Sequence, residues 1–201
     1  MTQAGHDSKT KLLDATLSVV RAKGYTATTV DDICAAADLT KGSFFHHFKS
    51  KDDLGVAAVD YWTQTTGAFF QDAPYHAHAD PLARVLGYIE FRKSLLHGAL
   101  ARYSCFPGTM VQETYDTHPA IREACGRSIV GHAATLEADI AAAMRQRGVK
   151  GDWTAESLAL HTQVVIQGAF VVAKATGGAE AAVQALDHLR RYFVLLFQDA
   201  A

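Results

Sequence analysis

The chain has 201 residues and a formal net charge of -2, and hydrophobic and charged residues make up 49% and 20% of it. This is the composition of an ordinary globular protein, which excludes a disordered, collagen-like or low-complexity chain. At this length folding hides roughly 70% of the surface that the unfolded chain exposes, so a stable core requires neither disulfides nor a structural metal. Because the net charge is slightly negative, any binding to nucleic acid must come from a local basic patch.

The cellular location is predicted from the start of the chain, its apolar stretches and its cysteines. The first ten residues lack the apolar run of a secretory signal. The longest strongly apolar stretch, residues 168–173, is far shorter than the ~20 residues of a membrane span. Three cysteines, Cys34, Cys105 and Cys125, include no C-x-x-C pair, which favours reduced thiols. We therefore expect a cytoplasmic protein without membrane contact.

Apolar residues recur at steps of three and four along nearly the whole chain, and no stretch alternates as a half-buried strand would. We therefore predict an all-α fold of about nine helices. The first runs over residues 7–23. The second starts in a capping box of Thr29 with Asp32, the third starts after Thr40, and the fourth starts in a capping box of Ser50 with residue 53.

The second half of the chain begins with an expected loop over residues 71–80, which lacks apolar periodicity and contains a proline. Asp80 followed by Pro81 is a helix start, because an aspartate cap and a proline in the first turn both favour one. The remaining helices are expected over residues 81–97, 107–115, 119–147, 154–176 and 179–198.

The two short helices between residues 29 and 48, braced by a longer one, have the arrangement of a helix-turn-helix, whose second helix enters the DNA major groove. Between residues 41 and 51 the chain has three lysines and no acidic residue. Gly42 lets a phosphate approach the free N–H groups at the start of the second helix. Spacing alone leaves an alternative equally open, because a helix-turn-helix with a solvated basic surface also occurs in proteins that never bind DNA.

The residues themselves carry a resemblance. The segments ATTVDDI (27–33), AADLTKGSFFHHF (36–48) and SKDDL (50–54) resemble the N-terminal signature of TetR-family repressors. This resemblance implies a DNA-binding domain over residues 1–53, a ligand-binding and dimerisation domain over residues 54–201, a homodimer and a small-molecule inducer. Tyrosine is usual in the family where this chain has Phe45, so a hydroxyl contact to phosphate is lost.

The residues expected to contact double-stranded DNA combine those that match the family pattern with two that follow from exposure and local charge. The matching positions are Thr29, Thr40, Lys41, Gly42, Ser43, Phe45, His46 and Lys51. His47 is added because we expect it to face outward beside the buried Phe44 and Phe48, and Lys49 is added for its charge.

Candidate ligand-binding residues downstream combine aromatic, thiol and ionisable side chains. They are Tyr61, Trp62, Phe91, Cys105, Phe106, Met110, Glu113 and His161. A core role for the aromatic residues remains an open alternative, as do pairing with a neighbouring group and simple surface exposure for Glu113 and His161. The segment around Cys105 also resembles a subgroup of the family whose matching cysteine responds to electrophiles or oxidants, as does the segment around Lys174, while an inert thiol is the alternative.

A dimer face is predicted on the last two helices, where small residues allow another helix to approach closely. Its candidate residues are Gln167, Gly168, Phe170, Leu189, Phe193 and Leu196. The alternative is that these helices only complete the core of a monomer.

The sequence predicts neither a metal nor another cofactor. His76 and His78 are a poor metal signal without further spaced ligands, and the common enzyme motifs are absent. We expect a repressor that binds a near-palindromic operator as a homodimer, with recognition helices about 34 Å apart, and that a small inducer releases. The alternative is a helical small-molecule-binding protein or enzyme with an incidental helix-turn-helix.

Overall fold

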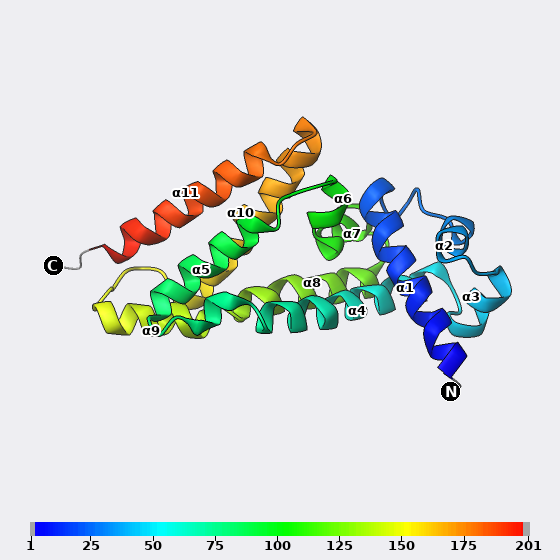
Figure 1. The fold of residues 1–201 in the computed structure, drawn as a ribbon, viewed down its shortest axis with the longest axis horizontal. Coiled ribbons are helices and arrows are strands. Elements are labelled where there is room, and N and C mark those ends of the chain that lie inside the picture. The colour runs from blue at the N-terminus through cyan, green and yellow to red at the C-terminus, as the bar shows by residue number, and fades with distance from the viewer. Residues whose placement is uncertain (1–2, 199–201) are drawn as a thin grey trace. The chain divides into compact units, whose positions relative to one another are not determined.

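The computed structural model describes residues 3–198, with side chains from residue 7, and every regular element in that range is helical (Figure 1). The helices are α1 (Gln3–Lys23), α2 (Val30–Ala37), α3 (Lys41–His47), α4 (Lys51–Gln71), a 3₁₀ turn (Pro74–Ala77), α5 (Pro81–Ser94), α6 (Leu100–Tyr103), α7 (Phe106–Thr114), α8 (Pro119–Ala134), α9 (Glu137–Arg147), α10 (Ala155–Thr176) and α11 (Glu180–Phe197). The predicted all-α class is confirmed.

The described chain has eleven α-helical segments where about nine were predicted. One extra segment is the single turn α6, and the other arises because the helix expected over 119–147 is divided into α8 and α9. The division falls at Thr135, whose N–H and hydroxyl both donate to the His132 carbonyl, while the Leu136 N–H donates to the Ala133 carbonyl. Hydrogen bonds to the third residue back tighten the chain and end the α-helical repeat.

The predicted starts of α2, α3 and α4 are confirmed, whereas α1 begins at Gln3, before the predicted residue 7. Thr29 and Asp32 form a complete capping box at α2, and the Thr40 hydroxyl accepts a hydrogen bond from the Ser43 N–H at α3. Asp38, in the turn between these helices, has the left-handed backbone conformation with φ of 52°. Aspartate tolerates that conformation better than most residues, so this turn forms without a glycine.

The packing divides the chain into two compact units. Unit 1 comprises residues 1–66 and 104–128, and unit 2 comprises residues 67–103 and 129–201, so α4 and α8 each contribute to both. In unit 1, α1 packs against α2, α3 and α7 around a core that includes Leu12, Tyr25, Phe44 and Phe106. The expected boundary between residues 53 and 54 divides the chain by function, and it stays a prediction.

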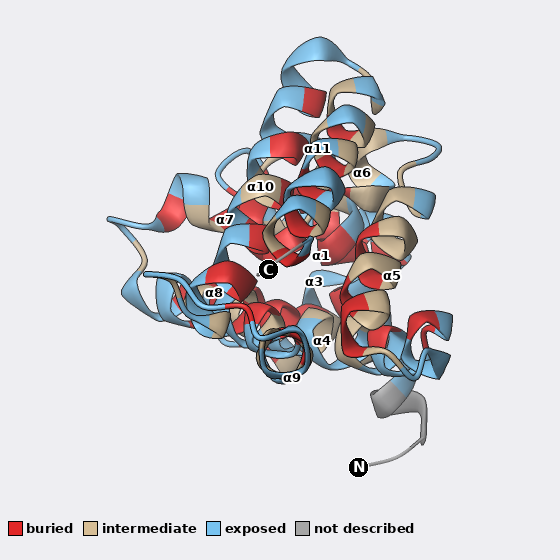
Figure 2. Ribbon diagram, turned by 90° about the vertical axis from the view of Figure 1, so that its left-hand side faces the viewer, coloured by how far each residue is buried: buried red, intermediate tan, exposed pale blue. Residues whose placement is uncertain are grey.

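Unit 2 is built on its long helices. Helix α10 packs against α9 and α11, and α5 packs against α9 and α11. Figure 2 shows buried positions on one side of these helices and exposed positions on the other. By length and composition α10 also meets the criterion for a membrane span, with a mean hydropathy of 1.3 over 18 residues, but 44% of that window is buried inside the protein. A core helix of a soluble protein passes the same test.

Candidate nucleic-acid interface and its supports

The start of α3 forms an exposed polar tip. Thr40, Lys41 and Gly42 are exposed, and the buried Phe44 fixes the opposite side of the helix in the core. One turn further along, Phe45 has 59% of its surface exposed and His46 is also exposed. The tip therefore combines N–H groups of the first helical turn, small side chains and an ammonium group, which together suit a phosphate.

Lys41 does not lie free at this tip. Its Nζ atom is 2.8 Å from Oδ1 of Asp31 on α2, and the two side chains are 60% and 68% exposed. The hydrogen bond to Asp31 raises the pKa of Lys41, so the ammonium stays charged at neutral pH. Because an ion pair this exposed is weak, a phosphate group can replace the carboxylate without a large penalty.

The expected outward orientation of His47 is wrong. Its Nε2 atom lies 2.7 Å from the Ser8 hydroxyl of α1, and the side chain is half-buried. Burial lowers the pKa of His47, and the charges of His46 and Lys9 add to this effect, so the ring is neutral at pH 7. His47 therefore joins α3 to α1, and a contact between His47 and DNA stays a prediction.

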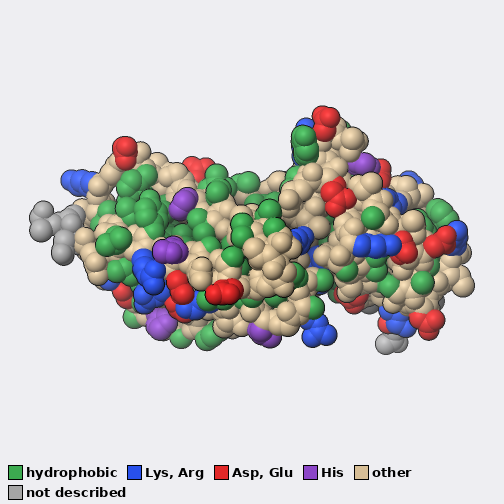
Figure 3. All heavy atoms as spheres, turned by 90° about the horizontal axis from the view of Figure 1, so that it is seen from above, with side chains coloured by type: hydrophobic (Ala, Val, Ile, Leu, Met, Phe, Trp, Pro, Cys, Tyr) green, Lys and Arg blue, Asp and Glu red, His purple; other side chains and the backbone are tan. Residues whose placement is uncertain are grey.

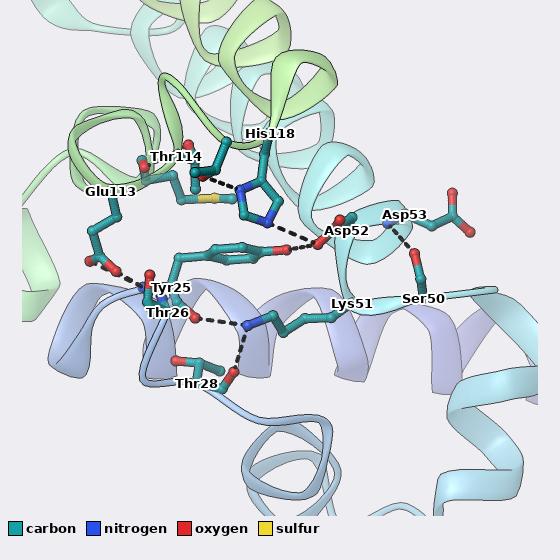
Figure 4. A network of polar contacts seen from close by, with 12 residues as sticks. Tyr25, Thr26, Thr28, Ser50, Lys51, Asp52, Asp53, Glu113, Thr114 and His118 are labelled. Atoms are coloured by element: carbon teal, nitrogen blue, oxygen red, sulfur yellow. Dashed lines mark hydrogen bonds and ion pairs between the residues drawn. The ribbon is translucent and has the colours of Figure 1, made fainter.

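Lys51 is also engaged inside unit 1 (Figure 4). Its Nζ atom donates to the carbonyls of Tyr25 at 3.2 Å and Thr28 at 3.1 Å, and lies 4.3 Å from the centroid of the Tyr25 ring. The first residue of α4 thus holds the turn that leads into α2. A contact between Lys51 and DNA stays a prediction, and the structure gives the side chain a bracing role in addition.

The same turn is held from a second side by α7. The Glu113 carboxylate accepts hydrogen bonds from the N–H groups of Tyr25 at 3.2 Å and Thr26 at 2.8 Å (Figure 4). Gly24 has φ of 87°, and a Cβ atom there would collide with this carboxylate. Glu113 is exposed and pairs with neighbouring backbone groups, so the structure supports these two alternatives, and a ligand role for Glu113 stays a prediction.

Tyr25 is the centre of this arrangement. Its hydroxyl donates to Oδ1 of Asp52 at 2.5 Å, and burial together with this hydrogen bond raises the pKa of Tyr25. The His118 ring packs edge-on against the Tyr25 ring, with 5.6 Å between the ring centroids, and its Nε2 atom lies 3.7 Å from the same Asp52 oxygen. We call this network the Tyr25 clamp, comprising Tyr25, Lys51, Asp52, Glu113 and His118. It fixes the chain immediately before the helix-turn-helix.

The other predicted ligand-binding residues are distributed over both units. Phe106 and Met110 are fully buried in the core of unit 1, which favours the core role left open for Phe106. The ring centroids of Trp62 and Phe106 are 6.2 Å apart, and the Arg21 guanidinium lies 5.1 Å from the Trp62 ring centroid. The Tyr61 hydroxyl donates a hydrogen bond to Oδ1 of Asp14 at 2.9 Å. Phe91 and His161 belong to unit 2. The eight residues therefore do not form one cluster within a unit.

Cys105 differs from the other two cysteines in exposure. Cys34 and Cys125 are buried, and burial raises the pKa of both thiols, that of Cys125 to about 12. Cys105 is half-buried and caps α7, where its Sγ atom accepts a hydrogen bond from the Gly108 N–H at 3.4 Å. Cys105 is thus the cysteine that a reagent in solution reaches most easily.

The predicted dimer face requires correction at three positions. Phe170, Leu189 and Phe193 are at most 7% exposed within a single chain, so they complete its core and have almost no area left for a partner. Gly168 is exposed, and Gln167 and Leu196 are half-exposed. The large exposed apolar residues of these helices are instead Leu160, Val164, Val171, Val172, Tyr192 and Leu195.

His161 belongs to this exposed surface. It lies on α10 beside Leu160, is itself exposed, and packs edge-on against Tyr192 at 5.4 Å. The surface alternative for His161 is therefore the one that the structure supports. Figure 3 shows hydrophobic side chains gathered over the C-terminal helices.

Unit 2 contains a polar network that the sequence did not indicate. The buried Tyr88 hydroxyl accepts a hydrogen bond from Nε2 of Gln163 at 3.0 Å and lies 3.0 Å from Nε2 of His132. Burial lowers the pKa of His132 to about 3, and the charge of Arg92 contributes, so the ring is neutral at pH 7. The only sequence signal was Gln163, a polar residue on an apolar helix, because the other partners come from α5 and α8.

Within residues 3–198, no three His, Cys, Asp or Glu side chains are grouped so that they could hold a metal ion. The two histidines of the 3₁₀ region do not converge on a shared site, since His76 Nε2 instead lies 3.0 Å from the Phe70 carbonyl.

Comparisons with known proteins agree with this geometry. Residues 12–58 match the family model described as "Bacterial regulatory proteins, tetR family", and residues 81–189 match "Tetracyclin repressor-like, C-terminal domain". The chain is 30% identical over 102 residues to the transcriptional regulator AcuR of Cereibacter sphaeroides, covering 51% of this chain and 47% of AcuR. It is 23% identical over 133 residues to the repressor NemR of Escherichia coli K12, covering 65% and 66% of the two chains.

Solved structures show the same fold. A TetR-family regulator from Agrobacterium tumefaciens superposes with a TM-score of 0.82 at 19% identity, covering 94% of this chain and 98% of the other. The reduced form of E. coli NemR superposes with a TM-score of 0.80 at 20% identity, covering 92% and 96%.

The chain has a helix-turn-helix followed by a helical C-terminal part, and the two family models together match more than half of its residues. The chain belongs to the TetR family of transcriptional regulators, whose members are typically ligand-responsive repressors and generally not enzymes. The sequence match spans about half the length of AcuR.

Proposed function

We propose that this protein is a cytoplasmic repressor that binds a near-palindromic operator as a homodimer and leaves it when a small molecule binds. The observation that supports this most directly is the exposed tip of α3, where Thr40, Lys41 and Gly42 stand clear of the core. The N–H groups of that turn and the Lys41 ammonium suit a backbone phosphate, and Phe45 and His46 follow at positions from which base edges and sugars are within reach.

The DNA assignment is tested at Lys41. Lys41→Ala should weaken binding to all duplexes and lower the slope of log K against log salt by up to about 0.9 per subunit, because one phosphate neutralisation is lost. Fluorescence anisotropy with an operator duplex and a scrambled duplex measures both quantities. Lys150→Ala, at an exposed lysine outside unit 1, is the matched control and should leave them unchanged.

Asp31→Asn is the complementary variant. It removes the carboxylate that holds Lys41 at 2.8 Å, so binding to DNA should become tighter and its salt dependence steeper. If Lys41→Ala binds both duplexes like the native protein, the tip of α3 is not the DNA contact and the assignment fails.

The homodimer is proposed from the apolar surface on α10 and α11. Val164 and Leu195 are 62% and 68% exposed there, and a monomer rarely leaves several such residues together in water. Leu195→Glu should convert the dimer to a monomer in sedimentation velocity experiments. Val130→Glu, at a residue of α8 that is 56% exposed, should not. A native protein that sediments as a monomer at micromolar concentration would contradict the proposal.

A further inference from the structure

Helix α5 carries three cations, and Arg92 differs from the other two. Arg84 donates to Oδ1 of Asp139 at 2.6 and 2.9 Å, and Lys93 pairs with Asp187 at 2.8 Å and Glu90 at 2.9 Å. For the Arg92 guanidinium, by contrast, no hydrogen bond or ion pair occurs among residues 3–198. A half-buried cation without an anionic partner is unusual, because burial weakens its hydration without a compensating pair.

Aromatic rings surround the Arg92 guanidinium instead. Its central carbon lies 5.1 Å from the ring centroid of Phe70, 5.8 Å from that of Phe170 and 6.0 Å from that of Tyr88. These distances are those of cation–π contacts, which hold the planar group in one orientation without using its N–H donors. All five N–H groups therefore remain available to a ligand.

The rings beneath the guanidinium are themselves fixed. Tyr88 is fully buried, and its hydroxyl is held by Gln163 and His132, each at 3.0 Å. Phe70 packs edge-on against His132 at 4.8 Å. A cation supported in this way is preorganised, because binding an anion requires no rearrangement of its surroundings.

The aromatic cluster also reaches the surface. Phe91 is half-buried and packs against Phe69 at 5.4 Å, and Phe69 is 48% exposed. On another side, Tyr103 is half-buried and lies 6.3 Å from Phe170. Arg92 thus stands at the edge of an apolar aromatic surface that solutes can approach, and all of these residues belong to unit 2.

These features define a ligand chemistry. A guanidinium with free N–H donors in a fixed fork matches a carboxylate, which accepts two parallel hydrogen bonds from it. The adjacent ring faces favour a flat, apolar remainder of the ligand. We propose that Arg92 binds the carboxylate of a flat, apolar organic acid, an aryl or arylalkenyl carboxylate, whose body lies on the neighbouring aromatic rings. That this acid is the inducer rests on the proposed function.

The site is tested by isothermal titration calorimetry on the full-length protein without DNA. The probes are benzoate and trans-cinnamate, each compared with its uncharged amide, benzamide and cinnamamide. Both acids should bind at millimolar concentration or below, and the amides should bind at least about tenfold more weakly, because they cannot pair with the cation.

Variants assign the binding to Arg92. Arg92→Gln should weaken the binding of the acids at least about tenfold and leave that of the amides unchanged, whereas Arg92→Lys, which keeps the charge but loses the fork, should have an intermediate effect. Arg145→Gln, at an exposed arginine of the same unit, is the control for net charge and should bind like the native protein. Circular dichroism verifies that each variant is folded, and if Arg92→Gln is not, Arg92→Lys and the comparison of acids with amides decide.

Three results would overturn the proposal: no binding of either acid, equal binding of acids and amides, or undiminished binding of the acids by a folded Arg92→Gln. The DNA measurements are separate. Acids that bind but leave operator affinity unchanged support the site and refute its role as the inducer site. A protein that binds acids but no DNA supports the site and refutes the proposed function.

Discussion

Replacing Lys51 by methionine separates a structural role from a direct contact with DNA. Methionine keeps most of the apolar stem and removes the ammonium, which donates to the carbonyls of Tyr25 and Thr28 and lies over the Tyr25 ring. Tyr25 O retains the Thr28 N–H as a donor at 3.1 Å, so its carbonyl stays paired. The Thr28 carbonyl loses the Lys51 hydrogen bond.

The magnitude follows from these contacts. A hydrogen bond from a charged donor contributes about 1.5 kcal/mol or more, and a partly exposed cation–π contact about 0.5–1 kcal/mol. Because one carbonyl stays paired, we expect Lys51→Met to lower the free energy of unfolding by about 2 kcal/mol. For a chain of this length such a loss corresponds to a fall in Tm of about 4–8 °C.

Thermal and urea unfolding followed by circular dichroism measure this loss. Lys49→Met is the matched control, because the Lys49 side chain is exposed, and it should change stability by less than about 0.5 kcal/mol. If Lys51→Met is as stable as Lys49→Met, and only the salt slope of DNA binding falls, Lys51 is a phosphate contact and the bracing role is wrong.

Three further predictions concern other residues. The pKa of His132 is about 3 in the folded protein and about 6.5 in the unfolded chain, so the unfolded state takes up the proton first as the pH falls. The free energy of unfolding should therefore decrease below pH 6.5, by up to about 1.4 kcal/mol per pH unit. Urea unfolding at several pH values measures this dependence, and His132→Gln should flatten it. Glu113→Gln leaves one backbone N–H facing an amide NH₂ group, so the Thr26 amide should exchange its hydrogen faster while Glu123→Gln, at an exposed glutamate, leaves it unchanged. A maleimide should label native protein at one thiol, and rapid labelling of Cys105→Ser would contradict the assignment.

The local features of the fold were predictable because their causes are local. The capping box at Thr29, the cap at Thr40 and the aspartate–proline start at residue 80 each depend on three or four neighbouring residues, and the structure has all of them. The burial of Phe44 and Phe48, four residues apart, likewise follows from helical spacing.

Features that depend on packing between helices were not predictable in the same way. The side of α3 that faces α1 decides whether His47 is exposed, and a seven-residue helix contains too few apolar positions to settle this from spacing. Leu189 and Phe193 form an apolar stripe on α11, but the stripe alone does not distinguish the core of one chain from a contact between two.

The missed residues of unit 2 illustrate the same limit. The cations of α5 are within ten positions of one another, and the sequence gives no sign that two of them have carboxylate partners from α9 and α11 while Arg92 has rings. Tyr88 and His132 are 44 positions apart, so their hydrogen bond follows only from the tertiary fold.

The ion pair between Lys41 and Asp31 gives the exposed tip of α3 a counterion from within the protein. When a phosphate displaces that carboxylate, the species set free is a tethered side chain rather than a dissolved cation, so this lysine contributes less of the entropy that drives loose, sequence-independent association. The carboxylate also stays close enough to rebind as soon as the phosphate departs. If the protein binds DNA as proposed, we expect such an internal competitor to shorten its residence time on random duplex and to favour sites where other contacts hold the protein in place.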